Sequence, residues 1–212
     1  GIDTEDASGY PGVRAVITGA DTAHLNPIPT ISPVTDHAGD LNIEPPRRIM
    51  ATDRVRHVGE SVALVVADSL LEARNAAEAV FVDYAERDSV VDEATALEDG
   101  APIVWDQAPG NLCYDWRAGD AAATTAAFDA ADHVVSFNYD GNRLHYAAVE
   151  TRVAIAMPTD DGMTLYCPSQ GAHLLQTLYA ERVFGEEKSW LRVVTGDVGG
   201  GVGPKYFAYV EK

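Results

Sequence analysis

Cysteine is scarce in this chain, whose 212 residues include only Cys113 and Cys167. Two cysteines are too few for a disulfide framework, and they form no C-x-x-C pair of the kind that binds metal or carries out thiol exchange. The two could still pair with each other. This usage favours a reducing compartment, and we expect a cytoplasmic protein.

Basic residues are also few, because 15 lysines and arginines stand against 33 aspartates and glutamates, for a formal net charge of −18. Cationic contacts with phosphates dominate nucleic-acid binding, so this balance argues against a nucleic-acid partner. No apolar run approaches the roughly 20 residues of a membrane-spanning helix. No basic segment followed by an apolar one opens the chain. We therefore expect a soluble protein with no membrane span and no export signal.

Common catalytic patterns of histidine and serine are missing as well. The histidines never fall four residues apart, so a helical zinc pair is unsupported; they lie at positions 24, 37, 57, 133, 145 and 173. Ser169 lies between a predicted strand and a predicted helix, as a hydrolase nucleophile would. That motif needs glycine two residues before the serine, and Cys167 is there instead. No spacing rule supports His173 and Asp197 as its partners, so a serine hydrolase is disfavoured.

Glycine, in contrast, is concentrated in the segment Gly199-Gly200-Gly201-Val202-Gly203-Pro204-Lys205, just after the apolar run 191–195. Such a cluster indicates either a tight turn or a place where backbone N–H groups approach an anionic ligand. A dinucleotide fingerprint fails because its sixth position is Pro204. A phosphate loop fails because Tyr206, not serine or threonine, follows the lysine.

The first half of the chain shows an α/β pattern. Strands are predicted at 13–18 and 61–67, and the second should be covered on both faces because it is apolar and β-branched. Ser69 and Glu72 fit a capping box that begins a helix reaching residue 79. We expect Val62, Leu64, Val66 and the apolar face of this helix to form a core. A proline-rich loop is predicted at 26–48, and short strands are predicted at 80–84 and 89–91.

The second half is predicted to begin after a linker without periodicity at 106–119. Asp120 should cap a helix reaching about residue 130, and 133–139 alternates like a strand. The Asp161-Gly162 step predicts the turn of a hairpin. The later elements are hairpin strands at 152–157 and 163–167, a helix at 172–184 ended by Gly185, and a strand at 191–195.

Two polar residues, His145 and Glu150, interrupt an otherwise apolar stretch. Buried polar groups need partners. We therefore favour a buried, hydrogen-bonded pair that orders the strand over a direct catalytic role for either residue.

Taken in order, these pieces resemble the molybdenum-binding large subunit of the xanthine dehydrogenase, aldehyde oxidase and aerobic carbon monoxide dehydrogenase family. The segments 11–18 and 58–68 resemble its opening α/β hammerhead domain. Five further pieces resemble the start of its cofactor-binding domain: Gly119-Asp120, His145, Glu150-Thr151-Arg152, Ser169-Gln170 and the loop 199–205. The resemblance implies an α+β fold, with a hammerhead domain at 1–106, a linker at 107–119 and the first part of the molybdopterin-binding domain at 120–212.

The same resemblance implies a molybdopterin cofactor carrying molybdenum, in the cytosine dinucleotide form. Gln170 matches the family glutamine that donates a hydrogen bond to an oxygen ligand of molybdenum, a role that an amide fills without adding charge. Gly200, Gly201, Val202 and Gly203 match the loop whose backbone N–H groups contact the cofactor. No catalytic residue and no metal ligand is expected in this chain, because the general-base glutamate and the copper-binding cysteine loop of true carbon monoxide dehydrogenases come from downstream.

Family members hydroxylate a substrate carbon with oxygen from water and pass the electrons to iron-sulfur clusters and FAD. The implied partners are the iron-sulfur and flavin subunits, the remainder of the large subunit and a second large subunit in a dimer. Both ends of the chain look cut, and we expect the isolated chain to be inactive. The alternative is a non-catalytic binding or assembly module with the same fold.

Two residues depart from the family pattern. Val202 stands where the family loop usually has phenylalanine, which removes a large side chain from the surroundings of the cofactor. Tyr206 stands where purine-oxidising members have glutamate, which disfavours a purine substrate. The segment 119–124 is nearer to the carbon monoxide dehydrogenase branch.

Overall fold

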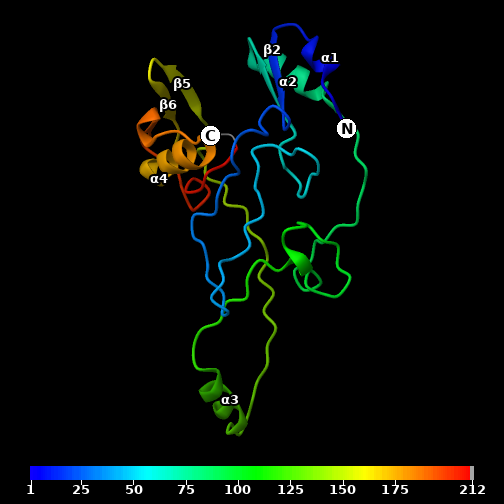
Figure 1. Cartoon of the computed structure of the whole chain (residues 1–212), viewed down its shortest axis with the longest axis vertical. Coiled ribbons are helices and arrows are strands. Elements are labelled where there is room, and N and C mark those ends of the chain that lie inside the picture. The colour runs from blue at the N-terminus through cyan, green and yellow to red at the C-terminus, as the bar shows by residue number, and fades with distance from the viewer. Residues whose placement is uncertain (211–212) are drawn as a thin grey trace.

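The computed structural model describes residues 1–210 and is elongated, with two lobes side by side at one end and a long arm at the other (Figure 1). The N-terminal lobe contains β1 to β4, the C-terminal lobe contains β5 to β7, and α3 lies at the tip of the arm. None of the helices in this part of the chain has the length and apolar character that crossing a membrane requires.

The N-terminal lobe is built from two small antiparallel sheets and two helices. Strand β2 (Val13–Thr18) pairs with β3 (Ala63–Ala67), and β1 (Ile2–Asp3) pairs with β4 (Phe81–Val82). Helix α1 (Glu5–Ser8) precedes β2, and α2 (Leu70–Glu78) follows β3.

The predicted cap of α2 is confirmed. The Ser69 hydroxyl oxygen accepts the Glu72 N–H at 3.2 Å and donates to the Glu72 carboxylate at 2.7 Å. This arrangement supplies a partner for one of the free N–H groups that begin any helix.

Two predictions for this lobe are wrong. Leu64 and Val66 of β3 are 51% and 42% exposed, so the strand is not covered on both faces and these residues are not core. Within the two helices of the lobe, the buried residues are the small Ala7 and Ala76. The predicted strand at 89–91 is absent because neither sheet extends to it.

The arm consists of exposed chain on either side of α3 (Ala121–Asp129). Asp120 caps this helix as predicted, since its carboxylate accepts the Ala123 N–H at 2.9 Å. A short 3-10 turn, Pro109–Asn111, lies within the predicted linker. The strand predicted at 133–139 is wrong for this structure, because the segment has no pairing partner in the described chain, and Phe137 is 81% exposed.

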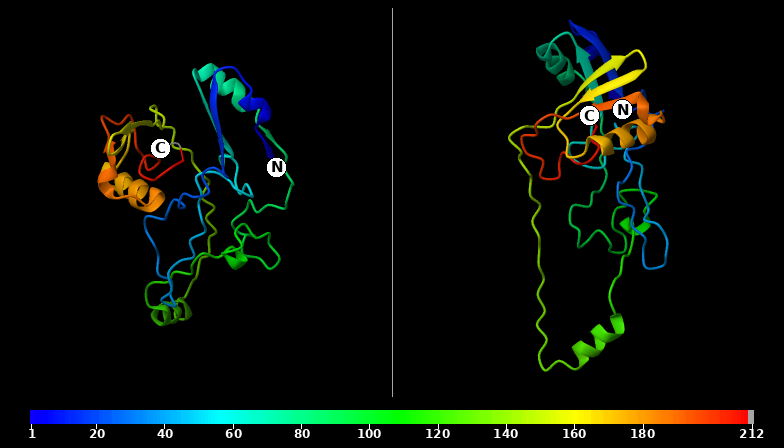
Figure 2. Two further views of the ribbon diagram at one scale, coloured as in Figure 1. Left: turned by 45° about the horizontal axis from the view of Figure 1, so that its top comes forward. Right: turned by 90° about the vertical axis from the view of Figure 1, so that its left-hand side faces the viewer.

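The C-terminal lobe contains a three-stranded mixed sheet covered on one side by a helix (Figure 2). Strands β5 (Ile155–Thr159) and β6 (Gly162–Tyr166) form the predicted hairpin, and β7 (Leu191–Val194) lies parallel to β6. Helix α4 (Ala172–Thr177) continues as a π-helix, Leu178–Phe184, and a 3-10 turn, Lys188–Trp190, leads into β7. The helical segment ends as predicted at Gly185, which has the left-handed φ of 72° that favours glycine there.

The main hydrophobic core lies in this lobe, and the proline-rich loop 26–48 packs against it. Ile28 of that loop is 4% exposed and lies in the cluster formed by Leu165, Leu175 and Val183. The Asn26 N–H donates to the Val183 carbonyl at 3.0 Å. The loop therefore connects the N-terminal part of the chain to the C-terminal lobe.

Candidate cofactor-binding site

The glycine loop and Gln170 lie at the same edge of the C-terminal sheet. Strands β6 and β7 are parallel, so the segments that follow them leave from neighbouring carboxyl ends. Gln170 follows β6 and the loop 199–205 follows β7. The Gln170 N–H donates to the Lys205 carbonyl at 3.1 Å, which holds the two segments together. All five candidate cofactor contacts, Gln170, Gly200, Gly201, Val202 and Gly203, thus belong to one surface.

The Gln170 side chain is oriented by the loop. Its Oε1 accepts the Gly203 N–H at 2.9 Å. Because the amide oxygen must face that donor, the amide NH₂ group points elsewhere. This NH₂ group has no acceptor among residues 1–210, and the residue is exposed. Gln170 therefore presents a neutral hydrogen-bond donor beside the loop.

Three of the glycines pack closely against this chain itself. A Cβ atom at Gly199 would lie 2.6 Å from the Glu150 Cβ, and one at Gly201 would lie 2.7 Å from the Gln170 Cδ. At Gly200 it would lie 3.1 Å from the Ala148 Cβ. Gly203 has open space around it but adopts a φ of 93°, which disfavours other residues.

The backbone N–H groups of the loop divide into two sets. Those of Gly199, Gly200 and Gly203 donate to the Glu150 carboxylate, the Val198 carbonyl and the Gln170 amide. Those of Gly201 and Val202 donate to no acceptor within the described chain. The Gln170 NH₂ group and two adjacent N–H groups therefore offer donors without positive charge, which suits an anionic cofactor.

Val202 holds an unusual backbone conformation at the middle of the loop. Its φ is 49°, in the left-handed region that β-branched residues rarely adopt, and its side chain is exposed. Strained conformations of this kind persist where neighbouring structure imposes them, and they concentrate at ligand sites. Here the fixed neighbours are Gly201 against Gln170 and Gly203 bound to Gln170.

Glu150 is paired with Lys205, not with His145. The Lys205 Nζ lies 2.6 Å from the Glu150 Oε2, with the lysine side chain 1% exposed and the glutamate side chain 38% exposed. The hydrogen bond from Lys205, followed by the Gly199 N–H, lowers the pKa of Glu150 below its ordinary value despite the opposing effect of burial. His145 is exposed, so the predicted buried pair is wrong, because the true partner lies 55 residues away.

Other polar contacts brace both sides of the loop. The Ser169 and Thr195 hydroxyls lie 2.8 Å apart, and the Thr195 hydroxyl also donates to the Cys167 carbonyl at 3.0 Å. Beyond the loop, the Tyr179 hydroxyl donates to the Tyr209 carbonyl at 2.8 Å and accepts its N–H at 3.0 Å. No sequence pattern indicated this role for Tyr179, which is buried in the structure.

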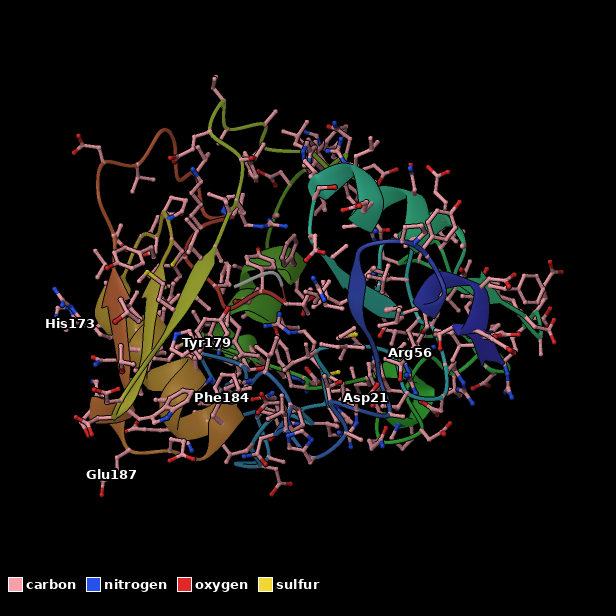
Figure 3. The ribbon with its side chains drawn as sticks, turned by 90° about the horizontal axis from the view of Figure 1, so that it is seen from above. Asp21, Arg56, His173, Tyr179, Phe184 and Glu187 are labelled. Atoms are coloured by element: carbon pink, nitrogen blue, oxygen red, sulfur yellow. The ribbon has the colours of Figure 1, made fainter. Side chains whose placement is uncertain are left out.

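The arrangement of Ser169 does not support a hydrolase. Its hydroxyl contacts Thr195, whereas His173 is exposed and points away from the lobe (Figure 3). Among residues 1–210, no group of three or more histidine, cysteine, aspartate or glutamate side chains could hold a metal ion. A wide hollow of about 1670 Å³ lies in the N-terminal part, around Arg54 and Arg87, and shares no residue with the glycine loop.

Comparison with known proteins gives matches over the whole chain. The family model of the aldehyde oxidase and xanthine dehydrogenase a/b hammerhead domain matches residues 1–88. That of the molybdopterin cofactor-binding domain matches residues 104–212. The two matches leave residues 89–103 between them.

Two of the relatives are named as a large chain or a large subunit, and a third is an aldehyde oxidoreductase. The carbon monoxide dehydrogenase large chain of Hydrogenophaga pseudoflava is 33% identical over 98% of this chain and 26% of the relative. The nicotine 6-hydroxylase large subunit of Paenarthrobacter nicotinovorans is 33% identical over 100% of this chain and 25% of the relative. The solved aldehyde oxidoreductase from Desulfovibrio gigas matches with a TM-score of 0.83 and 31% identity over 100% of this chain and 23% of its own. The chain therefore spans about a quarter of the length of these relatives.

Proposed function

Because this chain belongs to the xanthine dehydrogenase, aldehyde oxidase and carbon monoxide dehydrogenase family of molybdenum enzymes, we propose that it forms the N-terminal part of a large subunit that binds molybdopterin. One observation carries this proposal: Gln170 and the glycine loop meet at the carboxyl ends of two parallel strands, with the Gln170 NH₂ group and the Gly201 and Val202 N–H groups left as donors.

Each proposed contact has a distinct physical role. The bound cofactor, in its cytosine dinucleotide form, supplies the molybdenum chemistry by which oxygen from water is added to a substrate carbon. Gln170 donates a hydrogen bond to the anionic centre of the cofactor without changing its charge. Gly201 and Val202 donate from the backbone, while Gly200 and Gly203 allow the loop the positive φ angles that it has on either side of those donors.

The other parts of the reaction belong to other polypeptide. We propose that the general-base glutamate comes from the remainder of the large subunit, and that the electrons leave through iron-sulfur and flavin partner subunits. The relatives named as large chains or large subunits, and one named as the gamma subunit of a dehydrogenase complex, support a multi-subunit assembly. A dimer of large subunits and a cytoplasmic location complete the proposal.

The substrate is proposed to be something other than a purine. Tyr206 occupies the position where purine-oxidising members have glutamate, and its ring lies 5.5 Å from that of Phe207 in an edge-on contact. A tyrosine there cannot supply the carboxylate that pairs with a purine ring. The smaller Val202 leaves more space above the loop than phenylalanine would.

Isotope labelling of the assembled enzyme tests this function. The complete subunit with its partners is screened for dye reduction with N-heterocycles and aldehydes, and a heterocycle that reacts is then oxidised in H₂¹⁸O. The proposal predicts one ¹⁸O atom from water in the hydroxylated product. Label that comes only from O₂, or no reaction with any compound, would instead favour a different oxygenase chemistry or a non-catalytic module.

A further inference from the structure

Glu150 contacts both ends of the glycine loop. Its Oε2 accepts the Gly199 N–H at 2.8 Å and the Lys205 Nζ at 2.6 Å. Its own backbone N–H donates to the Gly199 carbonyl at 3.3 Å. One side chain from the end of the arm thus connects the first and last residues of the loop 199–205.

The electrostatics of this contact keep it formed. Lys205 is 1% exposed, and a buried cation is stable only with a closely paired opposite charge. Glu150 would be ionised at neutral pH even with its ordinary pKa of 4.5, and Lys205 and the Gly199 N–H lower this pKa further. The carboxylate therefore keeps both hydrogen bonds throughout the physiological range.

The contacts of Glu150 restrain the residues that lie between Gly199 and Lys205. A segment with four glycines in five positions has many accessible conformations unless it is restrained. Gly203 is restrained by Gln170, and Gly199 and Lys205 are restrained by Glu150. The Gly201 and Val202 N–H groups and the Gln170 NH₂ group are then held at fixed positions relative to one another, which lowers the entropy cost of binding a ligand.

We propose that Glu150 is a positioning residue for the cofactor site, which acts through Gly199 and Lys205 on the loop donors and on Gln170. This inference rests on the proposed function, since it concerns the same site. It assigns Glu150 no contact with the cofactor or with substrate.

The test compares variants of the complete subunit, purified with its partners. Glu150→Gln keeps the shape but removes the charge, and Glu150→Asp keeps the charge on a shorter side chain. Glu181→Gln is the matched control, because Glu181 is exposed in the same lobe and its side chain makes no hydrogen bond or ion pair in the described chain. The readouts are hydrogen exchange of the peptide covering 199–205, molybdenum retained after prolonged dialysis, and turnover per bound molybdenum.

We expect Glu150→Gln to speed exchange in the loop peptide about 10-fold and to reduce molybdenum retention by about the same factor, as for other residues that orient a metal site. Exchange in α2 should not change. Glu150→Asp should recover part of both effects, and Glu181→Gln should match the wild type. If Glu150→Gln fails to fold because Lys205 loses the charge of Glu150, Glu150→Gln combined with Lys205→Met removes both charges, and the loop should still exchange faster.

Wild-type exchange and molybdenum retention in the folded Glu150 variants would overturn the inference. If in that case Gln170→Ala still lowers turnover per molybdenum, the proposed function stands and only the positioning role fails. If the wild-type assembly holds no molybdenum, the proposed function fails, and the exchange measurement still shows whether Glu150 restrains the loop.

Discussion

The two ends of the Gln170 amide have different roles. Its Oε1 accepts the Gly203 N–H, and its NH₂ group has no acceptor among the described residues. In the complete subunit, Gln170→Ala should therefore lower turnover per bound molybdenum by roughly 10-fold to 1,000-fold. Folding should change little, since the side chain is exposed. Turnover normalised to molybdenum is the measurement, and Gln107→Ala, at another exposed glutamine, is the control. Unchanged turnover per molybdenum would remove Gln170 from the site.

Val202 is held in a conformation that glycine would adopt freely. Its φ of 49° costs a β-branched residue roughly 1–3 kcal/mol, and its side chain is 61% exposed, so it contributes little packing. Val202→Gly should raise stability by about 1 kcal/mol after the larger entropy of the unfolded glycine is subtracted. Denaturant unfolding of the chain measures this change. Clear destabilisation would show that Val202 is not strained in the native loop.

The ion pair of Glu150 should make the stability of the fold depend on pH in the acid range. Its pKa in the folded state is lowered from an ordinary 4.5, so the pair contributes stability above that value and loses it as the pH falls through the folded pKa. The wild type should be more stable than Glu150→Gln at pH 6, and the difference should shrink below about pH 4.5. Urea unfolding at a series of pH values measures it. A difference that stays constant down to pH 3 would contradict the assigned pairing.

At the scale of the elements, local chemistry was predictable and long-range pairing was not. Ser69 and Asp120 cap their helices as expected, because the N–H groups they accept lie within three residues. The hairpin at Gly162 follows from turn chemistry in the same way. Segment 133–139 alternates like a strand and 89–91 is also predicted as one, but a strand needs a neighbour to bond with, and the side-chain pattern contains no information about that neighbour.

The site was predictable to a similar extent. The order of its motifs indicated Gln170 and the loop, since each is a local sequence pattern. The pairing of Glu150 with Lys205 and the contact of Tyr179 with Tyr209 join residues 55 and 30 positions apart. Only the fold brings such residues together, so the glycines that pack against Glu150 and Gln170 could be read beforehand only as ligand contacts or a turn.

Limited proteolysis tests the proposed division of the chain. The linker and arm are exposed without sheet pairing, so trypsin should cut first after Arg117 or Arg143, before Arg74 within the capped helix α2. The loop 26–48 should be cut later than the arm, because Ile28 is buried in the C-terminal lobe. Mass spectrometry of the first fragments identifies the sites, and an initial cut after Arg74 would refute the proposed domain map.

At the scale of the whole molecule, the structure has an open cofactor edge and a long unpaired arm. Gln170 and the Val202 side chain are exposed, so the proposed cofactor site is open to solvent where they lie. Along the arm, Val135, Phe137 and Tyr139 are each more than 80% exposed. Apolar surface of this extent is typical of a segment that other polypeptide covers. The relatives, about four times as long, have that additional polypeptide.

The molybdenum content of the complete subunit, purified with its partners, tests the central claim most directly. Elemental analysis should find close to one molybdenum per large subunit. The isolated 212-residue chain, prepared in the same way, should hold almost none, because we propose that most cofactor contacts come from the remainder of the large subunit. A complete subunit that is folded and assembled but contains no molybdenum would contradict the assignment of Gln170 and the glycine loop to a molybdopterin site.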